Sequence, residues 1–184
     1  MKIEALRYGT TVVLREPTMD DVDDSLRFFK DLPPEDRKYL RVDVTRRENV
    51  EQRIREALEG RTYRIIALAN DKIIADGALE FSREEWRRHA GEIRAIVAHD
   101  YQRRGLGALL IKALYAVAHQ RGIEKLIAKM ASPQTGARKT LERLGFHVDS
   151  VLPDYIKDAN GGVQSMVVMS CTLDEVAKEL KGFY

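Results

Sequence analysis

The feature that most constrains this chain is a short glycine-bearing loop between an apolar run and an amphipathic segment. The loop reads Gln102-Arg103-Arg104-Gly105-Leu106-Gly107-Ala108. Residues 93–98, before it, are mostly apolar, partly β-branched and free of Gly and Pro, as is typical of a buried strand. After it, apolar residues recur at the spacing of one helix face: Leu106, Leu110, Ala113, Leu114 and Val117. A helix is therefore predicted to begin at the two glycines.

A glycine turn at a helix start favours anion binding, because the first backbone N–H groups of a helix lack partners and carry partial positive charge. Arg103 and Arg104 add charge that suits phosphate oxygens. The alternative is a solvated basic turn, and the loop alone does not separate the two. A P-loop is excluded because Ala108 follows Gly107, and a dinucleotide fingerprint because Leu110 replaces its third glycine.

Length and composition indicate an ordinary globular chain. With 184 residues, 44% of them hydrophobic, it is predicted to form one domain over residues 1–184. A formal net charge of +2 argues against a general nucleic-acid binder. No apolar stretch approaches the ~20 residues of a membrane helix, and residues 1–14 lack the core of a secretory signal. We therefore expect no membrane partner and a cytoplasmic location.

Cysteine and histidine usage points away from metal and disulfide chemistry. Cys171 is the only cysteine, and it lies in an apolar run where a buried thiol is more usual than a nucleophile. The four histidines are scattered without the spacing of metal ligands: His89, His99, His119 and His147. No metal site is predicted.

The remaining patterns predict a mixed α/β sheet. Strands are expected at Thr10–Leu14, Tyr63–Ala69, Lys72–Phe81, Glu92–Ala98, Lys125–Met130, Phe146–Leu152 and Val163–Cys171. Helices are expected from Thr18, from Thr45 to Gly60, at Trp86–His89, from Leu106 to Gly122, from Pro133 to Gly145 and over Thr172–Leu180. The helix between the strands at Glu92 and Lys125 implies a parallel pair with a right-handed crossover.

Local signals refine the element boundaries. Residues 18–21, 45–48 and 82–85 have the pattern of capping boxes. Asn70-Asp71 suits a tight hairpin turn. Trp86 is expected to pin its loop, in preference to lining a pocket.

With this loop and this order of elements, the chain resembles the GNAT superfamily, the acyl-CoA-dependent N-acetyltransferases. The loop at residues 102–108 is similar to the Q/R-x-x-G-x-G/A signature, and residues 96–101 resemble the lead-in from the family's fourth strand. Ala137 followed by Glu142-Arg143-Leu144-Gly145-Phe146 resembles the later helix that ends in Gly-Phe. The resemblance implies a mostly antiparallel sheet with one splayed parallel pair, flanked by helices.

The resemblance also implies acetyl-CoA as co-substrate and a backbone-based site for it. The loop amides from Gln102 to Ala108 would bind the pyrophosphate, and Ala95, Ile96 and Val97 would offer strand groups to the pantetheine arm. Gln134 occupies the position of a family Asn and would donate an amide hydrogen bond to the cofactor.

The implied reaction is direct attack by a primary amine, from a small amine, an amino acid or a protein. Glu92 stands near the position of the family's general base, and Glu80 is the reserve candidate. The alternative is that Glu92 pairs with Arg94 on the same strand face and is inert. Leu141 occupies the position of the family's thiolate-protonating Tyr. That leaves three candidates for the general acid: Ser132, Tyr155 and water.

The loss of that Tyr keeps a second hypothesis open, a non-catalytic acyl-CoA sensor. Sheet edges near the C-terminus make a homodimer possible.

Overall fold

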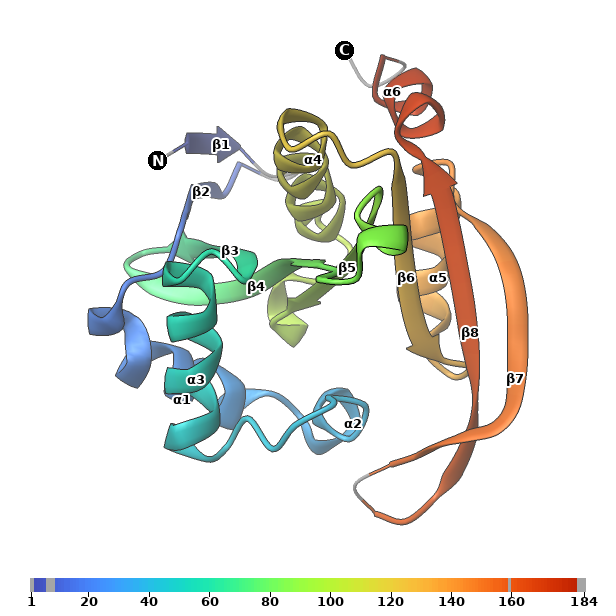
Figure 1. Ribbon diagram of the computed structural model, residues 1–184. Coiled ribbons are helices and arrows are strands. Elements are labelled where there is room, and N and C mark those ends of the chain that lie inside the picture. The colour runs from blue at the N-terminus through green and yellow to red at the C-terminus, as the bar shows by residue number, and fades with distance from the viewer. Residues whose placement is uncertain (1, 6–8, 159, 182–184) are drawn as a thin grey trace.

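The computed structural model describes residues 2–5, 9–158 and 160–181, and these form an eight-stranded sheet in the order β1-β2-β3-β4-β5-β6-β8-β7 (Figure 1). The strands are β1 (Lys2–Ala5), β2 (Thr11–Arg15), β3 (Thr62–Ala69), β4 (Lys72–Phe81), β5 (Ala90–Val97), β6 (Lys125–Ala131), β7 (His147–Lys157) and β8 (Val163–Thr172). The pair β5 and β6 is parallel, and the other neighbours are antiparallel. The predicted mixed sheet is confirmed.

Helices cover both faces of the sheet. They are α1 (Val22–Asp31), α2 (Pro34–Arg37), α3 (Arg47–Leu58), α4 (Leu106–Gln120), α5 (Thr135–Glu142) and α6 (Leu173–Lys181), with short 3-10 turns η1 (Met19–Asp21), η2 (Glu85–Arg87) and η3 (His99–Tyr101). In Figure 1, α4 lies on one side of β3–β5, and α1 and α3 lie on the other. None of the helices in the described part of the chain combines the length and apolar character needed to cross a bilayer.

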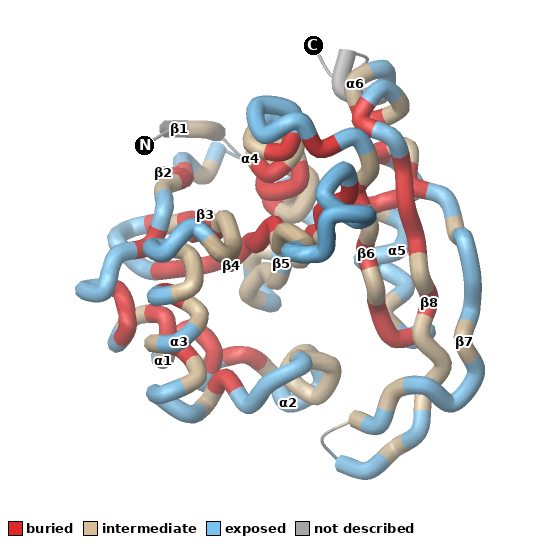
Figure 2. The backbone as a smooth tube through the Cα atoms, viewed as in Figure 1, coloured by how far each residue is buried: buried red, intermediate tan, exposed pale blue. Residues whose placement is uncertain are grey.

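Each helix layer has its own core. The larger one packs the apolar stripe of α4, including Leu106, Leu110 and Leu114, against the sheet. The smaller one packs Phe29 of α1 and Ile54 of α3 on the opposite face. Figure 2 shows the buried stretches concentrated in the central strands and in the faces of α1 and α4. This arrangement leaves the outer hairpin, β7 and β8, largely exposed at its far end.

Several local expectations are confirmed. Asn70 and Asp71 have φ of 48° and 59°, which fits the two left-handed positions of a tight hairpin turn. Asp21 reaches back to accept a hydrogen bond from the Thr18 N–H at 2.7 Å, as the capping pattern predicts. Cys171 is buried, which raises the pKa of its thiol to about 12 and fits an inert core residue.

Other expectations are wrong. The Thr45 hydroxyl donates to Asp43 at 2.5 Å instead of capping a helix, and α3 begins two residues later at Arg47. The helical spacing of Val50, Ile54 and Leu58 predicts that all three face the core, but Leu58 lies at the end of α3 and is exposed. Trp86 lies on η2 with 77% of its surface exposed, so it neither pins the loop nor fills a pocket. Strand β1 and helix α2 have no counterpart among the predicted elements.

Candidate active site

The parallel pair separates after a short run of contacts. β5 pairs with β6 only at Ala90–Lys125, Gly91–Leu126 and Glu92–Ile127, while β6 continues beside β8 to Ala131. The rest of β5 pairs with β4 alone within the described residues. Successive strand residues direct their backbone groups to opposite neighbours, and the Ala98 N–H donates to Ile74 of β4, so Ile96 faces Asp76 of β4 and, contrary to expectation, is not available to a ligand. The β6-facing backbone groups of Ala95 and Val97 have no strand partner there, as the splayed pair implied.

The glycine loop lies at the carboxyl end of β5, immediately before α4. Gly105 is the residue before the first turn of α4 and has φ of 90°, a left-handed conformation that glycine adopts without a steric penalty. Arg103 is also left-handed, with φ of 59°. In the described part of the chain, no hydrogen bond occupies the N–H groups of residues 103–108. These donors and the helix N-terminus together form an anion-binding cradle.

Side chains around the loop leave the cradle open. A Cβ added to Gly107 would meet no atom within 4 Å. The Gln102 amide donates to the Val97 carbonyl at 3.3 Å and to Asp36 at 3.2 Å, which ties the loop to the end of β5. The Arg104 guanidinium lies 5.4 Å from the ring centre of Tyr101. The loop is thus held in place from one side and accessible from the other.

Gln134 lies at the matching end of β6. It precedes α5, and its side-chain carbonyl accepts a hydrogen bond from the Ala131 N–H at 2.9 Å. That bond holds the side chain at the carboxyl edge of the parallel pair. The Gln134 NH₂ group has no hydrogen bond to the described residues, and it remains a donor on the same edge as the glycine loop.

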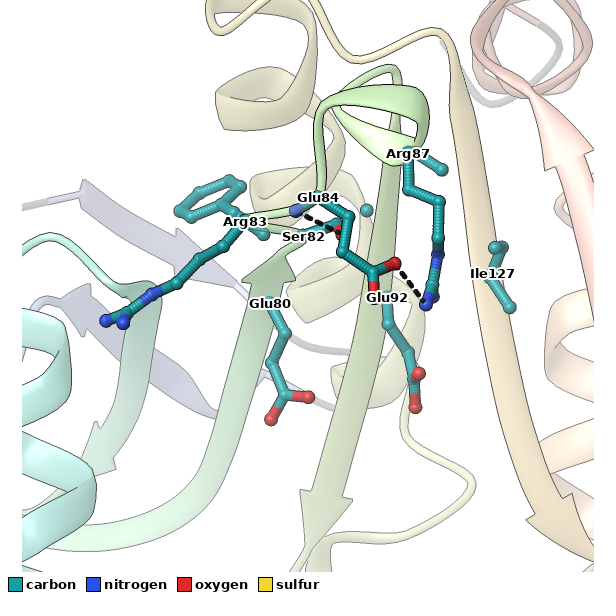
Figure 3. Close-up of a pocket in the computed structure, with 10 residues that line it drawn as sticks. Glu80, Ser82, Arg83, Glu84, Arg87, Glu92 and Ile127 are labelled. Carbon is teal, nitrogen blue, oxygen red and sulfur yellow. Dashed lines mark hydrogen bonds and ion pairs between the residues drawn. The ribbon is translucent and has the colours of Figure 1, made fainter.

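Glu80 and Glu92 lie directly opposite each other on β4 and β5 and face the same side of the sheet. Figure 3 shows both carboxylates pointing in the same direction, below the loop that carries Glu84 and Arg87. They line a cleft of about 330 Å³, whose other residues are Phe81, Ser82, Arg83, Glu84, Arg87, Ala90, Gly91 and Ile127. The structure therefore brings the two candidate bases together beside the point where β5 and β6 separate.

Glu92 is held between cations. Lys129 of β6 donates to it at 2.9 Å, Arg41 donates to its other oxygen, and the Arg94 Nε lies 3.9 Å away. Burial by itself raises the pKa of Glu92, but the hydrogen bond from Lys129 and the charge of Arg41 outweigh it, so the pKa lies below its ordinary value. Arg94 instead forms its close ion pair with Glu80. Glu92 is thus ion-paired, but its main partners are Arg41 and Lys129, and the expected partner Arg94 is only a distant one.

Sequence reasoning missed both of these partners. Lys129 carries a weak signal, since it is a charged residue between Ala128 and Met130 in a strand that is otherwise apolar after Lys125. Arg41 lies between α2 and α3, and nothing in its neighbourhood indicates a contact with a residue more than fifty positions away.

The candidates for a general acid lie in different settings. Leu141 is buried in the core under α4, so this position faces away from solvent. Ser132 is exposed just after β6, where its N–H donates to the Ser165 carbonyl at 2.9 Å. Tyr155 is exposed on β7. Neither hydroxyl makes a hydrogen bond within the described residues.

Comparison with known proteins decides the family. The profile of the Acetyltransferase (GNAT) family matches residues 23–146, which include β5, the glycine loop and α4. The chain belongs to the GNAT acetyltransferase family. This GNAT chain is also 34% identical over 73 residues to Acetyltransferase Pat of Mycolicibacterium smegmatis. The matched segment is 40% of this chain and spans only 21% of that relative.

Solved structures confirm the GNAT fold. Ribosomal-protein-S5-alanine acetyltransferase from Vibrio fischeri superposes with a TM-score of 0.78 at 15% identity, covering 93% of this chain and 98% of that chain. RimJ of Mycobacterium smegmatis, determined in complex with CoA-disulfide, has a TM-score of 0.76 at 18% identity, covering 98% and 93%. A Salmonella typhimurium protein, yncA, determined with its cofactor acetyl-CoA, has a TM-score of 0.77 at 16% identity, covering 89% and 94%.

Proposed function

We propose that this chain transfers an acetyl group from acetyl-CoA to a primary amine by direct attack. The observation that carries the proposal is the open cradle of N–H groups at residues 103–108, placed at the end of a strand pair that separates after three residue pairs. Acetyl-CoA and CoA-disulfide in two structurally similar GNAT proteins support the choice of donor.

The donor fits the geometry in two parts. The pyrophosphate accepts hydrogen bonds from the free loop amides of residues 103–108, since the Gln102 N–H already donates to the His99 carbonyl at 3.1 Å, and Arg103 and Arg104 neutralise its charge. The pantetheine amides then pair with the β6-facing backbone groups of Ala95 and Val97 in place of the missing strand, and the Val97 carbonyl, with two lone pairs, also accepts from the Gln102 side chain at 3.3 Å. The Gln134 NH₂ group offers one further hydrogen bond from the β6 side.

The reaction needs a neutral amine next to the thioester. A C–N bond forms as the C–S bond breaks; the amine loses a proton and the CoA thiolate gains one. Glu92 accepts or relays the amine proton, directly or through water, and Glu80 is the reserve because it lies opposite on the same face. A thiolate is a good leaving group, and Ser132, Tyr155 or solvent supplies its proton.

Replacing Gly107 by Trp tests the donor site. The Trp side chain would occupy the open side of the cradle without displacing protein atoms, because a Cβ at this position meets no atom within 4 Å. We expect the variant to retain its circular dichroism spectrum and to lose at least tenfold in acetyl-CoA affinity, measured by calorimetry.

Gln120→Trp is the matched control, since it places the same bulk on an exposed position at the far end of α4. It should bind acetyl-CoA as the unmodified protein does. Equal affinity in the Gly107→Trp variant would show that the cofactor lies elsewhere.

Leu141 favours one alternative, an acyl-CoA sensor without catalysis. A buried leucine replaces the phenol that many GNAT enzymes carry. Acetyl-CoA binding without thiol release across a broad panel of amines would favour the sensor, and amine-dependent thiol release would exclude it.

A further inference from the structure

Cations outnumber carboxylates around the cleft. Its lining and the ion-pair partners of its carboxylates include five cationic side chains, Arg41, Arg83, Arg87, Arg94 and Lys129, and three carboxylates, Glu80, Glu84 and Glu92. Each carboxylate already has a cation beside it. Glu84 pairs with Arg87 at 3.3 Å, Glu80 pairs with Arg94, and Glu92 is shared by Arg41 and Lys129. The excess charge in this part of the molecule is therefore positive.

A second cationic cluster lies behind the first on the same face of the sheet. Arg53 of α3 and Arg64 of β3 both bind one oxygen of Asp76, at 3.1 Å for Arg53. Arg64 and Asp76 are buried, so this group keeps a net positive charge in a poorly solvated place. In the strand register, Arg64 and Arg94 both lie opposite Ala78, one on each side of it. The buried cluster thus adjoins the Arg94 side of the cleft.

This crowding of positive charge is reflected in the pKa values of Arg53 and Arg94. Burial, together with the charges of Arg64 and Arg94, lowers the pKa of Arg53 to about 10 against the pull of Asp76. Burial and the charge of Arg41 also lower the pKa of Arg94. The Arg94 Nε is buried and has no hydrogen-bond partner within the described residues. An anion beside Arg41 and Arg94 would relieve both the repulsion and the missing hydrogen bond.

We propose that the acetyl acceptor is a small amine that carries its own carboxylate, as a free α-amino acid does, with Arg41 and Arg94 binding that carboxylate. This inference rests on the proposed acetyl transfer. The acceptor amine then lies beside Glu80 and Glu92, two bonds from the carboxylate carbon. A cleft of about 330 Å³ suits a ligand of this size. A lysine-rich peptide brings only further positive charge to this surface and is disfavoured.

The same surplus of cations has a catalytic benefit. Nearby positive charge lowers the pKa of an incoming ammonium group, because like charges disfavour the protonated form. The neutral amine needed for attack is then available without a strongly basic side chain. This agrees with a Glu92 whose pKa is lowered and which is therefore a weak base.

Matched ligand pairs test the proposal. Each standard α-amino acid is compared with the amine formed by its decarboxylation. One assay measures thiol release with acetyl-CoA, and the other measures binding to the CoA-saturated protein by calorimetry. We expect at least one amino acid to exceed its paired amine tenfold or more in kcat/KM and in affinity. Arg41→Gln and Arg94→Gln should each reduce that ratio several-fold, whereas Arg27→Gln, an exposed arginine on α1, should leave it unchanged.

Three results would overturn the proposal: paired amines that match their amino acids throughout, faster acetylation of a lysine-rich peptide, or an unchanged ratio in both arginine variants. Failure of the unmodified protein to bind acetyl-CoA is a different result, since it contradicts the proposed function. In that case amino-acid binding to the free protein still tests the anion site, and no carboxylate-dependent binding in any pair would refute it.

Discussion

At the scale of single residues, the environment of Glu92 determines what it is able to do. A carboxylate beside Lys129 and Arg41 stays ionised at neutral pH and takes up protons poorly. It is suited to orient an amine or a water molecule and to pass a proton on. The sequence indicated a pairing for Glu92 but named Arg94, because a neighbour two residues along a strand is visible in the sequence and contacts across the fold are not.

Under the proposed function, replacing Glu92 by Gln should lower kcat at least tenfold with little change in acetyl-CoA affinity, because the side chain lines the cleft and not the glycine loop. The lowered pKa keeps Glu92 ionised below the ordinary value of 4.5. The loss of rate caused by its protonation is therefore centred below pH 4.5. Profiles of kcat/KM against pH for both proteins measure this effect.

Glu48→Gln, at an exposed position of α3, serves as the control for a lost carboxylate. An acidic limb centred well above pH 4.5 that disappears in the Glu92 variant would contradict the lowered pKa. Full activity of the variant at every pH would remove Glu92 from the mechanism.

At the scale of elements, strands were predicted more securely than helix starts. The runs that became β3, β4 and β6 alternate or stay mostly apolar, and their bounds differ from prediction by one residue at most. Capping patterns predict helix starts less reliably, because a nearby side chain can bind the hydroxyl that would otherwise cap the helix. Asp43 accepts the Thr45 hydroxyl and displaces the predicted cap of α3.

The hairpin between β3 and β4 offers a test of backbone strain. Asp71 is exposed, with φ of 59°, so a glycine there removes the steric cost of the left-handed conformation and gives the preferred Asn-Gly turn. We expect Asp71→Gly to raise the free energy of unfolding by about 0.5–1 kcal/mol, measured by urea denaturation.

The control is Lys72→Gly, one residue further on at the exposed start of β4, where glycine weakens a strand and should destabilise the protein. A destabilised Asp71→Gly variant would show that the aspartate side chain contributes more than the turn conformation costs.

At the scale of the whole molecule, the sequence predicted the mixed sheet, its parallel pair and the loop that follows it. Those features depend on residues close together in the chain, such as Ile93 to Ala108. The charges around the cleft of Glu80 and Glu92 do not depend on such local patterns, since Arg41, Glu92 and Lys129 come from three distant segments. The contacts among these three side chains depend on how α1–α3 pack beside β5. Local sequence patterns do not predict that packing.

Acetyl-CoA is expected to stabilise the fold as a whole. At a concentration a hundred times its Kd, a ligand that binds only the native state adds about 2.7 kcal/mol. For a chain of this size the melting temperature should rise by roughly 5–10 °C in a thermal-shift experiment.

The Gly107→Trp protein provides the comparison for the thermal-shift experiment, because it should show little or no rise at the same acetyl-CoA concentration. An equal rise in both proteins would point to binding outside the glycine loop.

The brief contact between β5 and β6 has a mechanical consequence. Strands β1–β5 and β6–β8 amount to two half-sheets joined along a seam of three residue pairs, with the chain crossing between them through α4. A molecule whose amides bridge the open part of that seam acts as a temporary ninth strand. Under the proposed function, the donor closes the sheet on arrival and reopens it on leaving, so each turnover includes a cycle of stiffening and loosening along β5.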